Sequence, residues 1–261
     1  MPPGMSGCDE KYAISCGPGD LAGVPEKAKA PVDEDLDEVL ALKASAKSAR
    51  DDQDWDEAIS EVREAIRILL ARQAEAPRPL PSWLAAELAD AYGLMGGIER
   101  RWGLLLGGAE RERHLAASLA AYDQGFAFEK DLQPGEANTY NRVNRLVGRV
   151  FLNPDVLQGT GTADPEIFGE LREAEEILTR QIESARQQDP WAYCDLGTIR
   201  LLLGKPDALL TFKALDRLRP PAFVYDSTLA IVQPLSEVAA GVRPDLSRAA
   251  AQLRSSAGRR A

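Results

Sequence analysis

The sequence predicts an all-α protein built from antiparallel helix hairpins. Ala, Leu, Arg and Glu dominate the 261 residues and aromatic residues make up 6%, a composition that favours helix over sheet. Apolar residues recur three and four positions apart, and no segment shows a convincing run of alternating β-branched residues. With 44% apolar residues, the chain has ample material for a core.

The N-terminal segment differs in composition from the rest of the chain. Residues 1–32 hold five Gly and five Pro with little apolar periodicity, so we expect a disordered tail. The acidic run at 33–38 then opens a helix to about residue 50, because Asp and Glu in a first turn suit the helix dipole. We expect a helical repeat domain over 33–240, followed by a C-terminal helix and basic tail over 241–261.

The stretch "DDQDWDEAISEVREAI" (51–66) indicates the second helix of the first hairpin. Ala58, Val62 and Ala65 lie four and three residues apart, which places them on one helix face. The two Ala residues allow another helix to pack close to that face. Pro77 ends this helix near residue 76.

The next two helices are expected to lie far apart along the chain. Ser82 is a suitable N-cap for a helix that ends at Gly96 and Gly97. An insertion over 98–113 follows, and a further helix covers 114–132.

Helical patterns continue to the C-terminus. Asp164 before Pro165 combines an N-cap with Pro at the first helical position, a strong helix start. The remaining expected helices cover 136–152, 164–188, 191–204 and 207–218, with two short helices within 222–240 and one from 245 that frays into a basic tail.

The first hairpin matches the tetratricopeptide (TPR) pattern, whose period is about 34 residues. Ala58, Val62 and Ala65 take the small, large and small positions of its second helix, and Trp55 falls in the turn. Two later matches use Leu88, Ala89 and Tyr92, with Ser118, Tyr122 and Gly125 displaced downstream, and Leu196, Gly197, Gly204, Ala208, Phe212 and Leu215. The chain therefore resembles the TPR superfamily over about residues 36–220. The resemblance implies a solenoid with a right-handed superhelix of about four irregular repeats.

A narrower resemblance covers residues 120–146, "AAYDQGFAFEKDLQPGEANTYNRVNRL". This segment is similar to the TPR-like TRAF-binding, or central regulatory, region of apoptosis-signal-regulating MAP kinase kinase kinases and their bacterial relatives. No kinase segment accompanies it in this chain. The family implication is a non-enzymatic adaptor or scaffold that binds other proteins.

The resemblance also implies which residues line the concave groove. In the first repeat, alignment places Leu40, Lys43, Lys47 and Arg50 there. In the helix at 136–152, one register presents Arg142, Arg145 and Arg149, and a shift by one residue presents Asn141 and Asn144. Such donors suit an acidic peptide or a terminal carboxylate. The simpler alternative is that every amphipathic helix needs a polar side, which Lys and Arg fill.

Candidate catalytic and metal-binding residues are scarce. The one histidine, His114, follows a charged string and is expected on a helix surface, and the Cys and His residues are too few and scattered for a metal site. The glycines of "GTGTADP" (159–165) lack the Lys-Ser/Thr of a phosphate loop, so a flexible loop explains them better. We expect no catalytic residues, no metal and no cofactor.

The net charge and the cysteine count restrict the class of binding partner and the cellular compartment that we expect. A net charge of −10 argues against nucleic acid, and the apolar runs are too short for a membrane helix. Three cysteines without metal-like spacing, and no signal-like start, indicate a reducing, cytoplasmic location, with Cys8 and Cys16 idle or redox-active. The alternative function is a regulatory or sensor subunit that binds a small ligand, which a polar pocket of about 300 Å³ or more favours.

Overall fold

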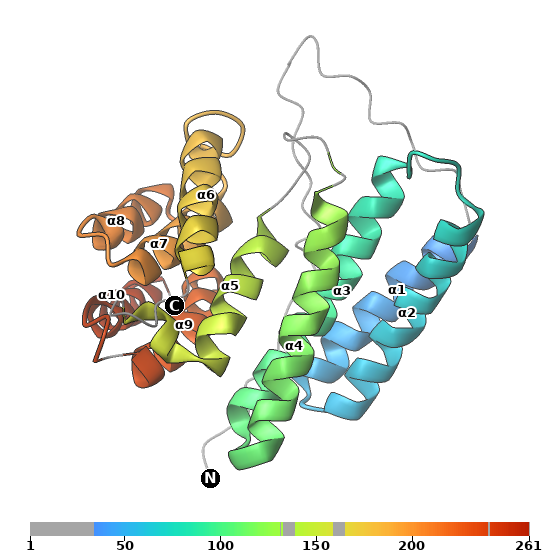
Figure 1. The fold of residues 1–261 in the computed structure, drawn as a ribbon, viewed down its shortest axis with the longest axis horizontal. Helices are drawn as coiled ribbons and strands as arrows, with labels where there is room; N and C mark the ends of the chain where they lie inside the picture. The colour runs from blue at the N-terminus through green and yellow to red at the C-terminus, as the bar shows by residue number, and fades with distance from the viewer. Residues whose placement is uncertain (1–33, 131, 133–138, 159–164, 240, 261) are drawn as a thin grey trace. The chain divides into compact units, whose positions relative to one another are not determined.

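The computed structural model describes residues 34–130, 132, 139–158, 165–239 and 241–260, so the tail expected over 1–32 and the loop at 159–164 lie outside the described residues. The described residues form ten α-helices and one 3-10 helix, with no strand among them, which confirms the all-α prediction. All of these helices belong to one compact unit. None of the helices described is long and apolar enough to cross a membrane. In order they are α1 (Glu34–Asp51), α2 (Trp55–Glu75), α3 (Ser82–Leu105), α4 (Gly108–Glu129), α5 (Tyr140–Leu152), η1 (Pro154–Leu157), α6 (Pro165–Ile182), α7 (Pro190–Leu203), α8 (Ala208–Leu218), α9 (Ala222–Ala239) and α10 (Asp245–Gly258) (Figure 1).

Helices α1 and α2 form the hairpin that the spacing of Ala58, Val62 and Ala65 predicts. The Asp54 carboxylate caps α2 by accepting a hydrogen bond from the backbone N–H of Glu57, at 3.3 Å. Ala58, Val62 and Ala65 are fully buried, as predicted, and α2 packs against α1. Trp55, the first residue of α2, stacks on Trp102 of α3 with the ring centroids 6.4 Å apart.

Helix α3 does not end at Gly96 and Gly97, so that prediction is wrong. These glycines lie inside a 24-residue helix, where they let α4 pack close. A Cβ on Gly96 would lie 2.8 Å from the Tyr122 ring of α4. The expected insertion at 98–113 instead lengthens both helices of the α3/α4 hairpin. Helix α4 packs along α3, and the rings of Tyr92 and Phe128 stack with their centroids 6.0 Å apart.

The C-terminal half differs from the sequence expectation at two boundaries. Helix α6 ends at Ile182 and turns fill residues 183–188, before Asp189 caps α7 by accepting from the N–H of Trp191 at 2.9 Å. Helix α9 is one continuous helix through Pro234, where two short helices were expected. Its buried apolar residues keep helical spacing on both sides of that proline, so packing outweighs the lost backbone hydrogen bond.

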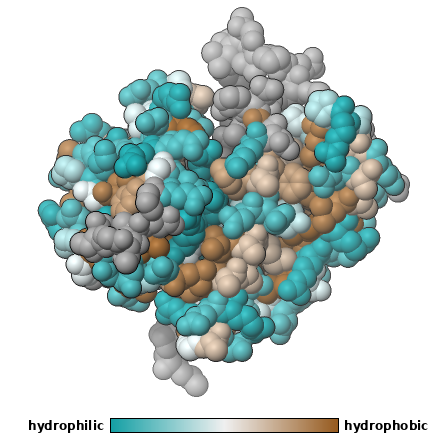
Figure 2. All heavy atoms as spheres, in the orientation of Figure 1, coloured by the Kyte–Doolittle hydropathy of each residue, from teal (hydrophilic) through white to brown (hydrophobic). Residues whose placement is uncertain are grey.

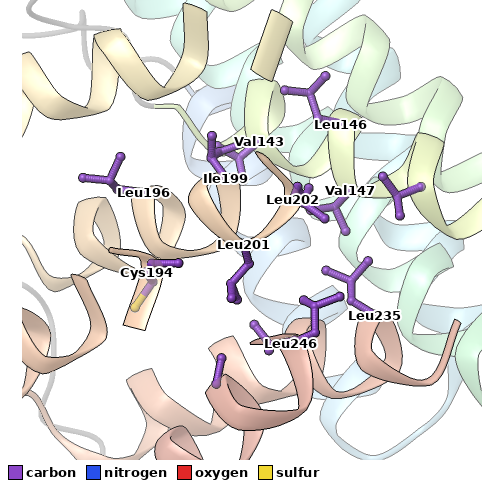
Figure 3. Packing of buried hydrophobic residues seen from close by; sticks show 14 of the residues in the cluster. Val143, Leu146, Val147, Cys194, Leu196, Ile199, Leu201, Leu202, Leu235 and Leu246 are labelled. Carbon is purple, nitrogen blue, oxygen red and sulfur yellow. The ribbon is translucent and has the colours of Figure 1, made fainter. Parts of the chain in front are cut away.

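The buried apolar side chains form two clusters. One belongs to α1–α4, and the other extends from α4 and α5 to α10. Figure 3 shows the second cluster, where Val143, Leu146 and Val147 of α5 meet residues of α7, α9 and α10. On the face drawn in Figure 2, hydrophobic residues (brown) form a band between hydrophilic areas (teal).

The odd-numbered helices contact one another in series. Besides the hairpin contacts, α1 touches α3, α3 touches α5, α5 touches α7, and α7 touches α9. Each odd helix from α3 to α9 therefore has the preceding odd helix as a neighbour. The arrangement places polar side chains of α1, α3 and α5 next to one another.

Candidate functional site

The predicted groove residues of α1 have three different environments. Lys43 is only 5% exposed, because its ammonium contacts Glu87 at 2.8 Å and also Asp90, both on α3. Burial alone lowers the pKa of Lys43, but the attraction and hydrogen bonds of Asp90 and Glu87 outweigh it and raise that pKa. Lys43, which the alignment places in the groove, is therefore buried, and its charge already serves the α1–α3 contact.

Lys47 and Arg50, by contrast, reach the surface. Lys47 is exposed and has no ion pair among the described residues. Arg50 is partly buried and binds the neighbouring Asp51 carboxylate at 2.7 and 2.8 Å.

The predicted arginines of α5 join neighbouring helices. Arg142 pairs with Glu173 of α6 at 3.1 Å, and Arg149 pairs with Glu170 of α6 at 2.7 Å. Arg145 bridges Glu170 of α6 and Asp123 of α4. Burial lowers the pKa of Arg145, but Glu170 and Asp123 outweigh it and raise that pKa.

Asn141 is buried, and it ties three helices together. Its backbone N–H and its side-chain amide each donate to Glu129 at 2.9 Å, and the amide also donates to the Ala89 carbonyl of α3 at 2.9 Å. A Cβ on Gly93 or Gly125 would lie 2.9 or 2.5 Å from the Asn141 side chain, so both glycines make room for it. Burial raises the pKa of Glu129 to about 7, despite the three hydrogen bonds that it accepts from Asn141 and Arg142.

Asn144, also buried, holds an arginine that sequence reasoning missed. Arg100 is 7% exposed and donates to the Asn144 side-chain oxygen, while the Asn144 amide donates to the Tyr140 carbonyl at 2.8 Å. The Arg100 guanidinium lies 5.6 Å from the centre of the Tyr122 ring. It forms no ion pair with a carboxylate in the described part of the chain. Helix α5 thus buries Asn141 and Asn144. Its three arginines, Arg142, Arg145 and Arg149, are partly exposed, so the two registers that the sequence left open correspond to a buried face and a partly exposed face.

Four donors on α1, α3 and α5 are exposed or partly exposed. We call Lys47, Arg50, Arg101 and Tyr140 the α1–α3–α5 donor strip. Arg101 of α3 lies 3.7 Å from the same Asp51 carboxylate that Arg50 binds. The Tyr140 hydroxyl lies 3.3 Å from where a Cβ on Gly97 would stand, one helical turn before Arg101. Arg101 and Tyr140 were missed because they lie outside the positions that the repeat alignment singled out.

His114 is buried at 4% exposure, so the expectation of a surface residue is wrong. Its Nδ1 lies 2.7 Å from Glu99, and its ring centroid lies 4.0 Å from that of Trp102. A guanidinium only donates, so the 3.2 Å contact of Arg113 with Nε2 makes that nitrogen an acceptor and leaves Nδ1 to donate to Glu99. A pocket of about 320 Å³ adjoins this pair and is lined by Asp56, Ile59, Arg63, Glu99, Trp102, Arg113, His114 and Ala117.

The cysteines and the metal-ligand types offer no reactive centre in the described residues. Cys8 and Cys16 lie outside the described residues, and burial raises the pKa of the Cys194 thiol to about 12, which keeps it protonated. Across the described ranges, no three His, Cys, Asp or Glu side chains gather as a metal site.

Comparisons with protein-family models, curated proteins and solved structures find no match to this chain.

Proposed function

We propose that residues 36–220 form a TPR-like solenoid that serves as a non-enzymatic, cytoplasmic adaptor or scaffold for a protein or peptide partner. The observation that carries this proposal is the serial contact of α1, α3, α5, α7 and α9. In a stack of helix hairpins, the first helices of successive hairpins line one wall, and such walls bind partners. Close approaches at the small positions of the TPR pattern also support it, since a Cβ on Gly197 would lie 2.5 Å from Phe212.

The α1–α3–α5 donor strip is the part of this wall that we assign to an acidic partner. Lys43, Arg142, Arg145 and Arg149 already pair with acids of neighbouring helices, so their charges mainly hold the wall together. A partner would have to displace those acids to use them. Lys47 has no such competitor among the described residues, and the acid between Arg50 and Arg101, Asp51, has a side chain that is 64% exposed.

Affinity capture from an extract of the native cells, with quantitative mass spectrometry, tests the proposal. The unmodified chain is compared with the strip variant Lys47→Glu/Arg101→Glu and with a control variant, Lys213→Glu/Arg217→Glu. Lys213 and Arg217 are exposed residues of α8, and their substitution changes the net charge by the same amount. We expect acidic partners that the control variant retains and the strip variant loses. Equal capture by both double variants would contradict binding at the strip.

A second candidate function is supported by the pocket beside His114. Its volume of about 320 Å³ and its charged lining fit a small polar ligand, as expected of a regulatory or sensor subunit. Thermal-shift screening of polar metabolites against the unmodified protein and Ala117→Trp, which fills the pocket, tests this function. A compound that stabilises only the unmodified protein supports it, and equal shifts in both proteins speak against it.

A further inference from the structure

Three guanidinium groups gather where α1 meets α3, with little carboxylate to balance them. Arg50 and Arg101 share one oxygen of Asp51, at 2.7 and 3.7 Å. Arg100 has the Asn144 amide and the Tyr122 ring as its neighbours, and forms no ion pair among the described residues. Burial, Arg50 and Arg100 together lower the pKa of Arg101, which shows that like charges crowd this position.

Two tyrosine rings lie one helical turn away along α3. Tyr122 packs on Gly96, four residues before Arg100, and the Tyr140 hydroxyl lies over Gly97, four residues before Arg101. The rings meet edge to face with centroids 5.9 Å apart. We call Arg50, Arg100, Arg101, Tyr122 and Tyr140 the Arg–Tyr cluster.

The Tyr122 hydroxyl is buried beside the Tyr140 hydroxyl, because both lie within 4 Å of where a Cβ on Gly97 would stand. Arg100 also contributes to the electrostatic environment of this hydroxyl. A ligand that carries negative charge would balance the positive charge of Arg100, which has no ion pair among the described residues.

We propose that the Arg–Tyr cluster binds the phosphoryl group of a phosphorylated segment in the protein partner. The inference rests on the proposed function and names the chemistry that the α1–α3–α5 wall recognises. Three guanidiniums against Asp51 leave a surplus of two positive charges, which matches the charge of about −1.5 to −2 on a phosphate monoester better than that of one carboxylate.

Access to the cluster runs through its outer members. The Arg101 side chain is 40% exposed, Tyr140 is 41% exposed, and Asp51 can turn to solvent as the phosphoryl group enters. Arg50 and Arg101 then donate paired N–H groups to phosphoryl oxygens, a geometry that guanidinium fits well. Arg100 adds positive charge from the buried side of the cluster, and Asn144 holds its guanidinium in place.

The first test uses inorganic phosphate as the probe, with chloride at the same ionic strength as the reference. We expect phosphate to raise the melting temperature and to give a saturable calorimetric isotherm with the full chain. Affinity should fall at least tenfold in Arg101→Ala and severalfold in Tyr140→Phe, while Arg101→Lys falls between because it keeps charge without the paired donors. The matched control Arg217→Ala, an exposed arginine on α8, should bind as the unmodified protein does.

Two results of this test would overturn the proposal. One is an equal effect of chloride and phosphate, and the other is unchanged phosphate affinity in both Arg101→Ala and Tyr140→Phe. Circular-dichroism melting of each variant checks that the fold persists. Because Arg101 and Tyr140 are partly exposed, at least one of the two variants should fold normally.

The second test asks whether the phosphoryl group belongs to the partner. The captured partner is titrated before and after phosphatase treatment, and we expect at least tenfold weaker binding afterwards. If the dephosphorylated partner binds equally well at the strip, the phosphoryl inference fails and the adaptor function stands. If phosphate binding depends on Arg101 but no protein partner needs the strip, the ligand is a free phosphate compound, and both the adaptor proposal and the phosphosegment are overturned.

Discussion

Gly96 of α3 and Tyr122 of α4 touch so closely that a Cβ on Gly96 would lie 2.8 Å from the tyrosine ring. The contact joins the long hairpin at the level where Ser118 also donates to the Gly96 carbonyl at 2.7 Å. It brings the Tyr122 hydroxyl to the inner side of the Arg–Tyr cluster. The absence of a side chain at Gly96 thus determines both the packing of α3 on α4 and the position of Tyr122 beside Arg100.

Gly96→Ala is therefore expected to destabilise the protein. The added methyl meets a fully buried ring, and overpacking of this kind costs about 1–3 kcal/mol, more than the helix propensity of Ala returns. Gly169→Ala is the control, because Gly169 lies in α6 with nothing within 4 Å of an added Cβ. Urea unfolding should show a loss for the first variant and a gain of up to about 1 kcal/mol for the second. Equal effects would contradict the tight contact.

Ala58→Glu tests the packing of the first hairpin. Ala58 is fully buried, so a charged side chain there should cost several kcal/mol or prevent folding. Ala71→Glu, at an exposed position of the same helix, should change the stability by less than about 0.5 kcal/mol. An unchanged melting temperature in Ala58→Glu would remove the repeat assignment where it is best supported.

Lys43 and Lys47 should respond differently to the same substitution. Lys43→Glu places a buried negative charge beside Glu87 and Asp90, and leaving such charges unpaired costs about 3–5 kcal/mol. Lys47→Glu changes an exposed residue and should leave the melting temperature nearly unaltered. Thermal melts of the two variants decide this, and equal melting temperatures would show that Lys43 does not hold α1 to α3.

Glu129 should make stability fall as pH rises from about 4.5 to 7. Burial raises its pKa in the folded state to about 7, above the ordinary value of 4.5, so the folded protein binds the extra proton in this window. Deprotonation then favours the unfolded chain, with a total contribution of roughly 3 kcal/mol above pH 7. Urea unfolding at several pH values should show a shallower dependence in Glu129→Gln, and parallel profiles would contradict the raised pKa.

Local periodicity predicts the helices well, because each amphipathic face is encoded within a few turns. Ala58, Val62 and Ala65 needed only their own spacing to be recognised as buried. Gly96 could not be interpreted in this way, because glycine serves equally as a helix end and as a point of close approach. The choice depends on Tyr122, which lies 26 residues further along the chain and reaches Gly96 only in the folded hairpin.

The candidate site was harder to predict, because its members meet across helices. From the sequence alone, either the asparagines or the arginines of α5 could face the groove. Asn141 is buried because Glu129 accepts its hydrogen bond and because Gly93 and Gly125 leave room for its side chain. His114 follows a charged string, yet Glu99 on the preceding helix gives it a buried partner. A sequence shows the type of charge at Lys43 but not the acids that neutralise it.

The central claim is that an acidic partner binds the wall formed by α1, α3 and α5. Calorimetric titration of the captured partner against the unmodified chain, Lys47→Glu/Arg101→Glu and the α8 control Lys213→Glu/Arg217→Glu tests it most directly. The account predicts at least tenfold weaker binding by the strip variant, unmodified affinity in the control, and weaker binding at higher salt, because salt screens charge attraction beyond about 10 Å at 0.1 M. Unmodified affinity in the strip variant would contradict the claim.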